Sequence, residues 1–187
     1  MRDVVIALLP VTVAGVILFG LRALLPIVMC VACCVGFEAL FNVIMKREQT
    51  IGDLSAVVTG LLLALNLPAN IPLWQCAIGS LFAIIIVKCL FGGLGFNVVN
   101  PAITARVFML VAFTSMATAV HPVDVEASAT PLATHEMPSL MDMFLGTHGG
   151  CIGETCTVAL IIGGVVCTAL SMCDILGRSI PMPSYIF

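Results

Sequence analysis

Residues 23–45 read ALLPIVMCVACCVGFEALFNVIM, an apolar run whose only charged residue is Glu38. A helix needs about 20 consecutive, mostly apolar residues to cross the hydrocarbon layer of a bilayer. Pro26 lies near the start of the run, where a helix tolerates proline. The run therefore predicts a membrane-spanning helix.

The rest of the composition agrees with a membrane setting. Hydrophobic residues make up 61% of the 187 residues, charged residues only 9%, and the mean hydropathy is +1.21. A soluble domain usually carries about 25% charged residues, so the solvent of this chain is mostly lipid. The net charge of −3 and the scattered Lys and Arg residues argue against nucleic acid as a partner, because no basic patch exists to neutralise phosphates.

Further apolar runs predict an all-α, polytopic membrane protein with about six spans. No small-residue cleavage site ends the first run, so we interpret it as a span rather than a signal peptide. Asp53 precedes the third run and is expected to cap its helix. The predicted spans are residues 4–19, 23–45, 54–67, 73–90, 104–120 and 155–173, and a further one begins at 181–187.

Positive charge gives the orientation, because cytoplasmic loops are enriched in Lys and Arg. Lys46 and Arg47 follow the second span and place that loop in the cytoplasm. The alternation of spans then puts Lys88 at the cytoplasmic side and residues 121–154 outside, where no Lys or Arg occurs. Arg22, in a tight external turn, is the exception.

No metal site is predicted. Most of the nine cysteines lie in or at the ends of apolar runs, where free cysteine behaves as a small hydrophobe. The spacing of Cys30 and Cys33 suits a metal, but their neighbours are apolar, and the three histidines are scattered along the predicted external segment.

The sequence FGGLGFNVVNPA at residues 91–102 interrupts the apolar pattern. Non-helical backbone at membrane depth survives only inside protein or beside a water-filled cavity. Asn97 and Asn100 can satisfy freed backbone groups or coordinate an ion. The alternative is a cytoplasmic loop, followed by a helix whose first turn starts at Pro101.

Three charged residues are candidates for function. Glu38 is an intramembrane carboxylate and a candidate for a cation pathway, or it pairs with Lys46 or Arg47. Arg106, early in the fifth span, either serves an anionic group, forms an ion pair, or reaches back to the cytoplasmic interface. Glu154 lies in GGCIGET at 149–155, whose glycines allow close backbone approach, and either caps the sixth span or lines an ion route.

The polar stretch DVEASATPLA at residues 124–133 lies between very apolar segments. Its small residues Ala127, Ser128 and Ala129 leave the hydroxyl of Thr130 accessible. Pro131 restricts Thr130 to extended or turn geometry. The alternative is an ordinary Ser/Ala/Pro loop.

This stretch resembles the flavin-attachment motif of the RnfD/NqrB family of ion-pumping redox complexes. The run K88-x-x-FGG-x-G-x-N-x-x-NPA-x-x-x-R-x-F108 is also similar to that family, and DLSAVVTGLLLALNLP at 53–68 looks like RnfD rather than NqrB. In the family, the threonine that ends a Ser/Thr-Gly-Ala-Thr run carries FMN through a phosphoester, which implies covalent FMN on Thr130. Asp124, Ala129 and Thr130 agree with the pattern, whereas Ala127 and Ser128 depart from it. A second, non-covalent flavin (riboflavin or FMN) is compatible with the resemblance, with Arg106, Asn97 and Asn100 as candidate contacts.

The resemblance implies a fold of two inverted five-helix repeats, related to urea channels. Residues 1–120 would form the first repeat, 121–154 an extracytoplasmic flavin segment, and 155–187 the start of the second repeat. The implied function is electron transfer within a ferredoxin:NAD oxidoreductase that pumps Na⁺ or H⁺, in a bacterial or archaeal cytoplasmic membrane. Its partners would be other Rnf-type membrane subunits, including a second covalent-flavin subunit, and no catalytic centre would be complete in this chain alone. A urea-channel-like transporter and a purely structural membrane subunit are the alternatives.

Overall fold

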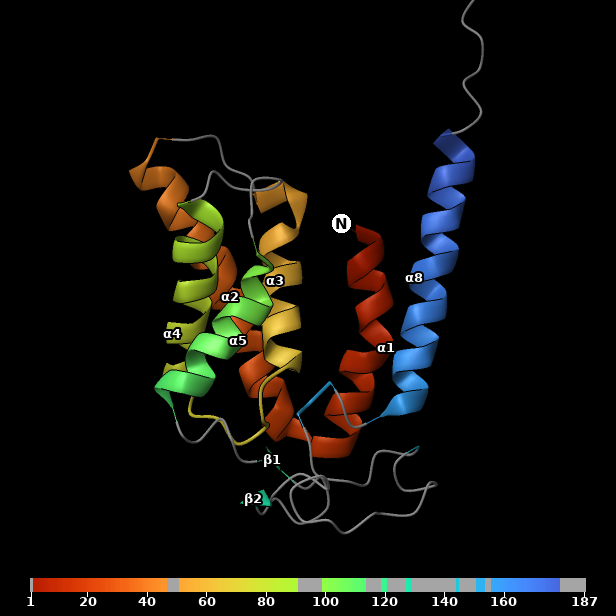
Figure 1. Cartoon of the computed structure of the whole chain (residues 1–187), viewed down its shortest axis with the longest axis horizontal. Helices are drawn as coiled ribbons and strands as arrows, with labels where there is room; N and C mark the ends of the chain where they lie inside the picture. The colour runs from red at the N-terminus through yellow and green to blue at the C-terminus, as the bar shows by residue number, and fades with distance from the viewer. Residues whose placement is uncertain are drawn as a thin grey trace, which may run out of the picture.

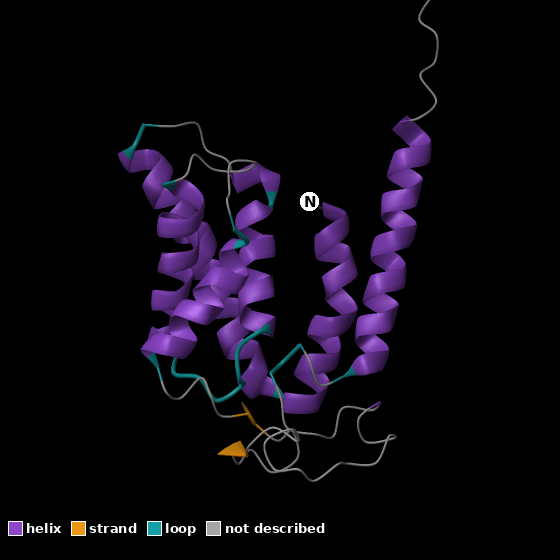
Figure 2. Ribbon diagram, in the orientation of Figure 1, coloured by secondary structure: helices purple, strands orange, loops and turns teal. Residues whose placement is uncertain are grey.

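A computed structural model of the chain describes residues 2–46, 51–90, 99–113, 119–120, 127–128, 144, 151–153 and 156–178. Helices dominate this part, and two very short strands pair beside them (Figure 2). The elements are α1 (Arg2–Phe19), α2 (Leu21–Ile44), the 3₁₀ turn η1 (Ile51–Asp53), α3 (Ser55–Leu65), α4 (Leu73–Leu81), the π-helix η2 (Phe82–Cys89), α5 (Pro101–Ala112), β1 (Ala119–Val120), β2 (Ala127–Ser128) and α8 (Thr157–Arg178).

The helices form two groups (Figure 1). Helix α2 packs against α3, α4 and η2, and α5 packs on the same group, while α1 packs most extensively against α8. Gly20 forms the turn between α1 and α2 with a φ of +69°. Glycine adopts this left-handed conformation readily because it lacks a Cβ, so a single residue reverses the chain between the first two helices.

Length and composition allow α1 and α2 to cross a membrane. The helices predicted at 4–19 and 23–45 are present, with bounds within two residues of the expected ones at each end. Helices α3 and α5 are shorter, with 11 and 12 residues. At 1.5 Å per residue, neither α3 nor α5 reaches the roughly 30 Å of a hydrocarbon layer.

The predicted boundaries of the fifth span were wrong. Helix α5 begins at Pro101, three residues before the expected start, because Asn100 Oδ1 accepts a hydrogen bond from the Ala102 N–H at 3.0 Å and caps the helix. Proline suits the first turn of a helix, where its missing N–H is not needed. The helix ends at Ala112, because Phe113 adopts extended dihedral angles, and Val120 lies in a strand instead.

The predicted cap of the third helix was also wrong. Asp53 belongs to the 3₁₀ turn η1, and the residue before α3 is Leu54, which makes no side-chain capping bond. Leu54 has a φ of +57°, a left-handed conformation that a non-glycine residue rarely adopts. The chain therefore enters α3 through a strained residue rather than through a capping carboxylate.

Glycine allows two pairs of helices in the larger group to approach closely. A Cβ on Gly60 of α3 would lie 2.8 Å from Val31 Cα of α2, and one on Gly79 of α4 would overlap Met109 of α5. Small residues at such contacts let helix backbones pack tightly where no water drives their association. The outer surface remains apolar, with Ile17, Leu21 and Val111 more than 70% exposed, and a surface of this kind suits lipid.

Residues 151–153 form a short segment that we call the strap. The N–H groups of Ile152 and Gly153 donate to the carbonyls of Leu67 (3.1 Å) and Leu65 (2.8 Å). These carbonyls lie at and just beyond the end of α3, where the helix leaves backbone acceptors without partners. Ile152 is 1% exposed, and a Cβ on Gly153 would lie 2.8 Å from Leu65 Cβ. The close backbone approach predicted for the glycines of 149–155 is thus confirmed at Gly153.

Strands β1 and β2 pair antiparallel, with Ala119 opposite Ser128 and Val120 opposite Ala127. They lie at the end of the bundle where α1 turns into α2 (Figure 1). This pair is the exception to an otherwise helical fold in the described part of the chain.

Candidate functional site: a buried ion pair between three helices

The strongest candidate site in the described residues surrounds Glu38. Glu38 lies on α2 and is 2% exposed. Lys88 of η2 donates a hydrogen bond from Nζ to Glu38 Oε2 at 2.7 Å and another to Ser55 Oγ of α3 at 2.6 Å. Three separate elements therefore converge on one ammonium group, and we call Glu38, Ser55 and Lys88 the polar triad.

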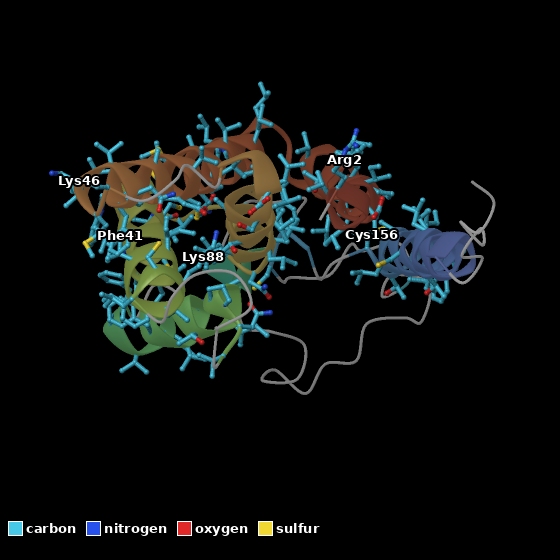
Figure 3. The ribbon with its side chains drawn as sticks, turned by 90° about the horizontal axis from the view of Figure 1, so that it is seen from above. Arg2, Phe41, Lys46, Lys88 and Cys156 are labelled. Atoms are coloured by element: carbon cyan, nitrogen blue, oxygen red, sulfur yellow. The ribbon has the colours of Figure 1, made fainter. Side chains whose placement is uncertain are left out.

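This arrangement is not evident in the sequence, because Glu38 and Lys88 are 50 residues apart. Viewed from above, Lys88 points into the larger helix group, whereas Lys46 points away from it (Figure 3). The expected pairing of Glu38 with Lys46 was therefore wrong: Lys46 is exposed, just beyond the end of α2. Arg47, the other expected partner, lies outside the described residues. Lys88 is 3% exposed and is therefore buried within this helix group, and its place at the cytoplasmic side stays a prediction.

A buried, mostly apolar cluster adjoins the triad. Cys34, Ala56, Ile84 and Cys89 form a buried cluster, against which phenylalanines of α2 pack. Cys34 precedes Glu38 by one helical turn, and Ala56 and Cys89 adjoin Ser55 and Lys88 in sequence. A charge in such a setting loses its hydration, so a buried carboxylate must be neutralised by a partner or a proton.

Two more polar side chains extend the site along the same helices. Asn42 is 6% exposed and follows Glu38 by one turn of α2, so the two share a helix face. Thr59 Oγ1 donates to the carbonyl of Ser55 at 2.9 Å, one turn along α3. Both α2 and α3 therefore carry a further buried polar side chain one turn from the triad.

Lys88 lies in a π-helix. Helix α4 continues directly into η2, and beyond it the Leu90 N–H bonds to the carbonyl of Ile85, five residues earlier, at 3.1 Å. This bonding changes the angular position of each following side chain compared with an α-helix. π-Helical turns are rare and are frequent at functional sites, so the irregular geometry of η2 is a second mark of function at Lys88.

Arg106 is directed to a different place. Its Nη2 lies 3.8 Å from Cys151 Sγ of the strap. The strap lies at the far end of α3 from Ser55, and the reach of Arg106 to the cytoplasmic interface stays a prediction. This guanidinium joins α5 to the segment that enters α8.

The structure describes only part of the remaining candidate set. Asn100 caps α5, as the alternative with a helix starting at Pro101 implied. Ser128 lies in β2. Asn97, Asp124, Ala129, Thr130 and Glu154 lie outside the described residues. Among the described residues, no group of three or more His, Cys, Asp or Glu side chains is arranged to hold a metal ion.

Sequence reasoning named Glu38 but missed its partner Lys88 and also Ser55, which accepts a hydrogen bond from Lys88. Ser55 looked like an ordinary residue of the first turn of a helix. The available signal was Lys88 itself, the only charged residue in the apolar run 73–90. An intramembrane lysine requires a partner, and Glu38 is the one acidic residue within the predicted spans that precede it.

Comparison with known proteins decides the family. The sequence profile of the NQR2, RnfD, RnfE family matches residues 1–182. The chain belongs to this family. The chain is 47% identical over 176 residues to the D subunit of the Na⁺-translocating ferredoxin:NAD⁺ oxidoreductase complex of Acetobacterium woodii, covering 88% of this chain and 55% of that protein.

Two further relatives show the breadth of the family. The D subunit of the proton-translocating ferredoxin:NAD⁺ oxidoreductase complex of Clostridium ljungdahlii is 38% identical over 184 residues, covering 88% of this chain and 56% of that protein. The B subunit of the Na⁺-translocating NADH-quinone reductase of Stutzerimonas stutzeri is 43% identical over 145 residues, covering 70% of this chain and 35% of that protein. The chain spans about half the length of the two D subunits.

Proposed function

We propose that this chain is a membrane subunit of an ion-pumping ferredoxin:NAD⁺ oxidoreductase and carries FMN on Thr130. The similarity to two D subunits of such complexes, over 88% of the chain in each case, is the observation that carries the proposal. The chain would act with other Rnf-type membrane subunits, among them a second covalent-flavin subunit. Residues 1–120 would form the first helical repeat and residues 155–187 the start of the second.

The arrangement of charges supports an orientation with residues 121–154 outside the cell. Helix α1 begins, and α2 and α8 end, at one end of the bundle (Figure 1). Arg2, Lys46 and Arg178 belong to these helix ends, as expected for the cytoplasmic side of a bacterial or archaeal membrane. Strands β1 and β2 lie at the opposite end, so the flavin segment would be extracytoplasmic.

The residues near Thr130 suit a phosphoester-linked flavin. Pairing of β2 with β1 anchors Ser128 two residues before Thr130, and the intervening Ala129 is small enough to leave the hydroxyl accessible. Arg106 extends toward the strap at the same end of the bundle, which places a positive charge at the end where β1 and β2 lie. Bound FMN would supply reversible electron transfer, and the tether would hold it at this end of the protein without a binding equilibrium.

The ionisable residues in the bundle are the candidates for ion movement. Glu38 is an intramembrane carboxylate with a partner on another element, a pattern typical of cation pathways. Glu154 remains a second candidate. We propose that Glu38 contributes to the path of the pumped Na⁺ or H⁺.

Mass spectrometry of the peptide containing Thr130 tests the flavin. The complex is produced in a host that attaches flavins to proteins of this family. We expect an FMN adduct on this peptide and a fluorescent band in a denaturing gel, both lost in Thr130→Ala. Thr134→Ala, four residues away in the same segment, is the matched control and should keep the adduct. An unmodified Thr130 peptide from this host would reject the flavin and favour a channel-like or structural subunit.

A further inference from the structure

We infer that the ammonium of Lys88 is a built-in competitor for the translocated cation: it occupies the oxygens of Glu38 and Ser55 until the cation displaces it. The inference rests on the proposed ion-pumping function and deepens it. It assigns Lys88 and Ser55 to the ion path and makes Lys88 the residue that sets the apparent affinity for the ion.

The contacts of Lys88 define a site for a small cation. Its Nζ lies 2.7 Å from a carboxylate oxygen and 2.6 Å from a hydroxyl oxygen, with all three side chains buried. An ammonium is a compact point charge on a flexible stem. Carboxylate and hydroxyl oxygens are also hard ligands of the kind that suit metal cations such as Na⁺. The position now held by Nζ is therefore a place where another cation finds the same partners.

Burial makes the exchange obligatory. Glu38 is 2% exposed, and an unneutralised carboxylate at such a buried position would be very costly. The Lys88 ammonium, a metal cation or a proton can each neutralise it. Because these groups compete for the same carboxylate oxygen of Glu38, one of them can leave only when another arrives.

The π-helix gives Lys88 a way to leave. Lys88 is the penultimate residue of η2, and Leu90, just beyond the end of that helix, is 65% exposed. A four-carbon stem lets the ammonium reach out to the interface while its methylenes stay in apolar surroundings. Conversion of the π-helical bonds to α-helical ones would also rotate Lys88 away from Glu38, since the two patterns place its side chain at different angles.

Charge balances in each exchange. A Na⁺ ion that arrives at Glu38 replaces the Lys88 charge there, and Lys88 carries its own charge toward the interface. A proton that arrives instead makes Glu38 neutral, and Lys88 leaves in the same way. The return of Lys88 expels the ion and closes the path behind it. The nearby titratable groups are Cys34 of α2 and Cys89 of η2.

The test compares Lys88→Met with Lys88→Arg in the complete complex in vesicles. Met keeps much of the length of the side chain without the charge, so the competitor is gone. If Lys88 occupies the oxygens in about nine of ten complexes, the ion concentration at half-maximal uptake should fall roughly tenfold. Arg stays charged and can bind the carboxylate with two hydrogen bonds, so it should raise that concentration several-fold. Na⁺ titration at constant ionic strength and pH titration without Na⁺ distinguish the metal ion from the proton.

A second readout does not depend on electron transfer. Lys88→Met leaves Glu38 without its ammonium, so added Na⁺, or a lower pH, should raise the melting temperature of the detergent-solubilised complex. The double variant Glu38→Gln/Lys88→Met removes both charges and should lose this response. Lys46→Met, an exposed lysine, should behave like the wild type in both measurements.

The outcomes separate this inference from the proposed function. The role of Lys88 would be overturned if Lys88→Arg keeps the wild-type ion concentration at half-maximal uptake and Lys88→Met shows no cation-dependent melting. Lys88 and Glu38 would then form a purely structural ion pair, even if Thr130 carries FMN. If Lys88→Met does not assemble, the titration of Lys88→Arg decides alone. A cation-dependent shift in Lys88→Met without FMN on Thr130 would support the site and reject only the redox function.

Discussion

The two ends of the short helix α3 are held in contrasting ways. At its start, Ser55 belongs to the polar triad, where side chains from three elements meet around a buried charge. At its far end, the strap satisfies the carbonyls of Leu65 and Leu67 through backbone N–H groups alone. Side-chain contacts can be exchanged by rotation about side-chain bonds, whereas the strap can yield only if the chain itself moves. The triad end is therefore suited to switching and the strap end to holding the scaffold in place.

Removing one charge of the triad should have the largest effect on stability. Glu38→Ala leaves the Lys88 ammonium buried without its carboxylate, which costs about 3–5 kcal/mol for a buried pair. We expect a large fall in the melting temperature of the purified protein in detergent. The double variant Glu38→Gln/Lys88→Met should recover most of the loss, because no uncompensated charge remains.

Lys46→Met is the control, because Lys46 is exposed and exposed substitutions usually change stability by no more than about 0.5 kcal/mol. If Glu38→Ala has the same melting temperature as Lys46→Met, water or another group already solvates the triad. The contrast between the two ends of α3 would then no longer rest on a dry ion pair.

Crowding the strap should have the next largest effect. A Cβ on Gly15 would lie 2.7 Å from Ile152 Cγ2 and 2.9 Å from the Ile152 carbonyl oxygen. Gly15→Ala should therefore displace the strap and cost about 1–3 kcal/mol, the usual range for overpacking. Thermal unfolding in detergent measures the loss, which should not depend on added Na⁺.

Gly36→Ala is the matched control for Gly15→Ala. Gly36 also lies inside an apolar helix, but nothing lies within 4 Å of the position of its Cβ. Alanine there should be neutral or stabilise the helix by about 0.5–1 kcal/mol. Equal behaviour of the two variants would contradict the close packing of α1 on the strap.

The sequence predicted the long elements well and the short ones less well. The bounds predicted at 4–19 and 23–45 lie within two residues of those of α1 and α2. The long apolar runs stop near Gly20 and Lys46, so the sequence shows where these helices end. Helix α5 was placed too late and extended too far, because apolar residues continue beyond Ala112 while the backbone becomes extended at Phe113. Hydropathy counts residues and does not register such a change in dihedral angles.

The candidate site was predicted in part for a related reason. Glu38 stands out as a lone carboxylate in an apolar run, and the sequence indicated its importance. Its partner depends on which way Lys88 faces, and that direction follows from the π-helical bonds of η2. A local change from α to π bonding leaves no distinct hydrophobic period, so the pattern indicates that Lys88 needs a partner but not the direction in which its side chain points.

The smallest expected effect is that of substituting Asn100. Its contact combines the two kinds seen at the ends of α3, because a side chain accepts a hydrogen bond from a backbone N–H group. Asn100 Oδ1 accepts from the Ala102 N–H at 3.0 Å and starts α5. Asn100→Ala should destabilise the protein by about 1 kcal/mol, as for other lost helix caps. Asn100→Asp keeps an accepting oxygen and should retain the wild-type melting temperature. Ion uptake separates structure from function: if Asn100 only caps α5, then Asn100→Asp transports like the wild type. A change in half-maximal ion concentration in Asn100→Asp at unchanged stability would instead place Asn100 on the ion path.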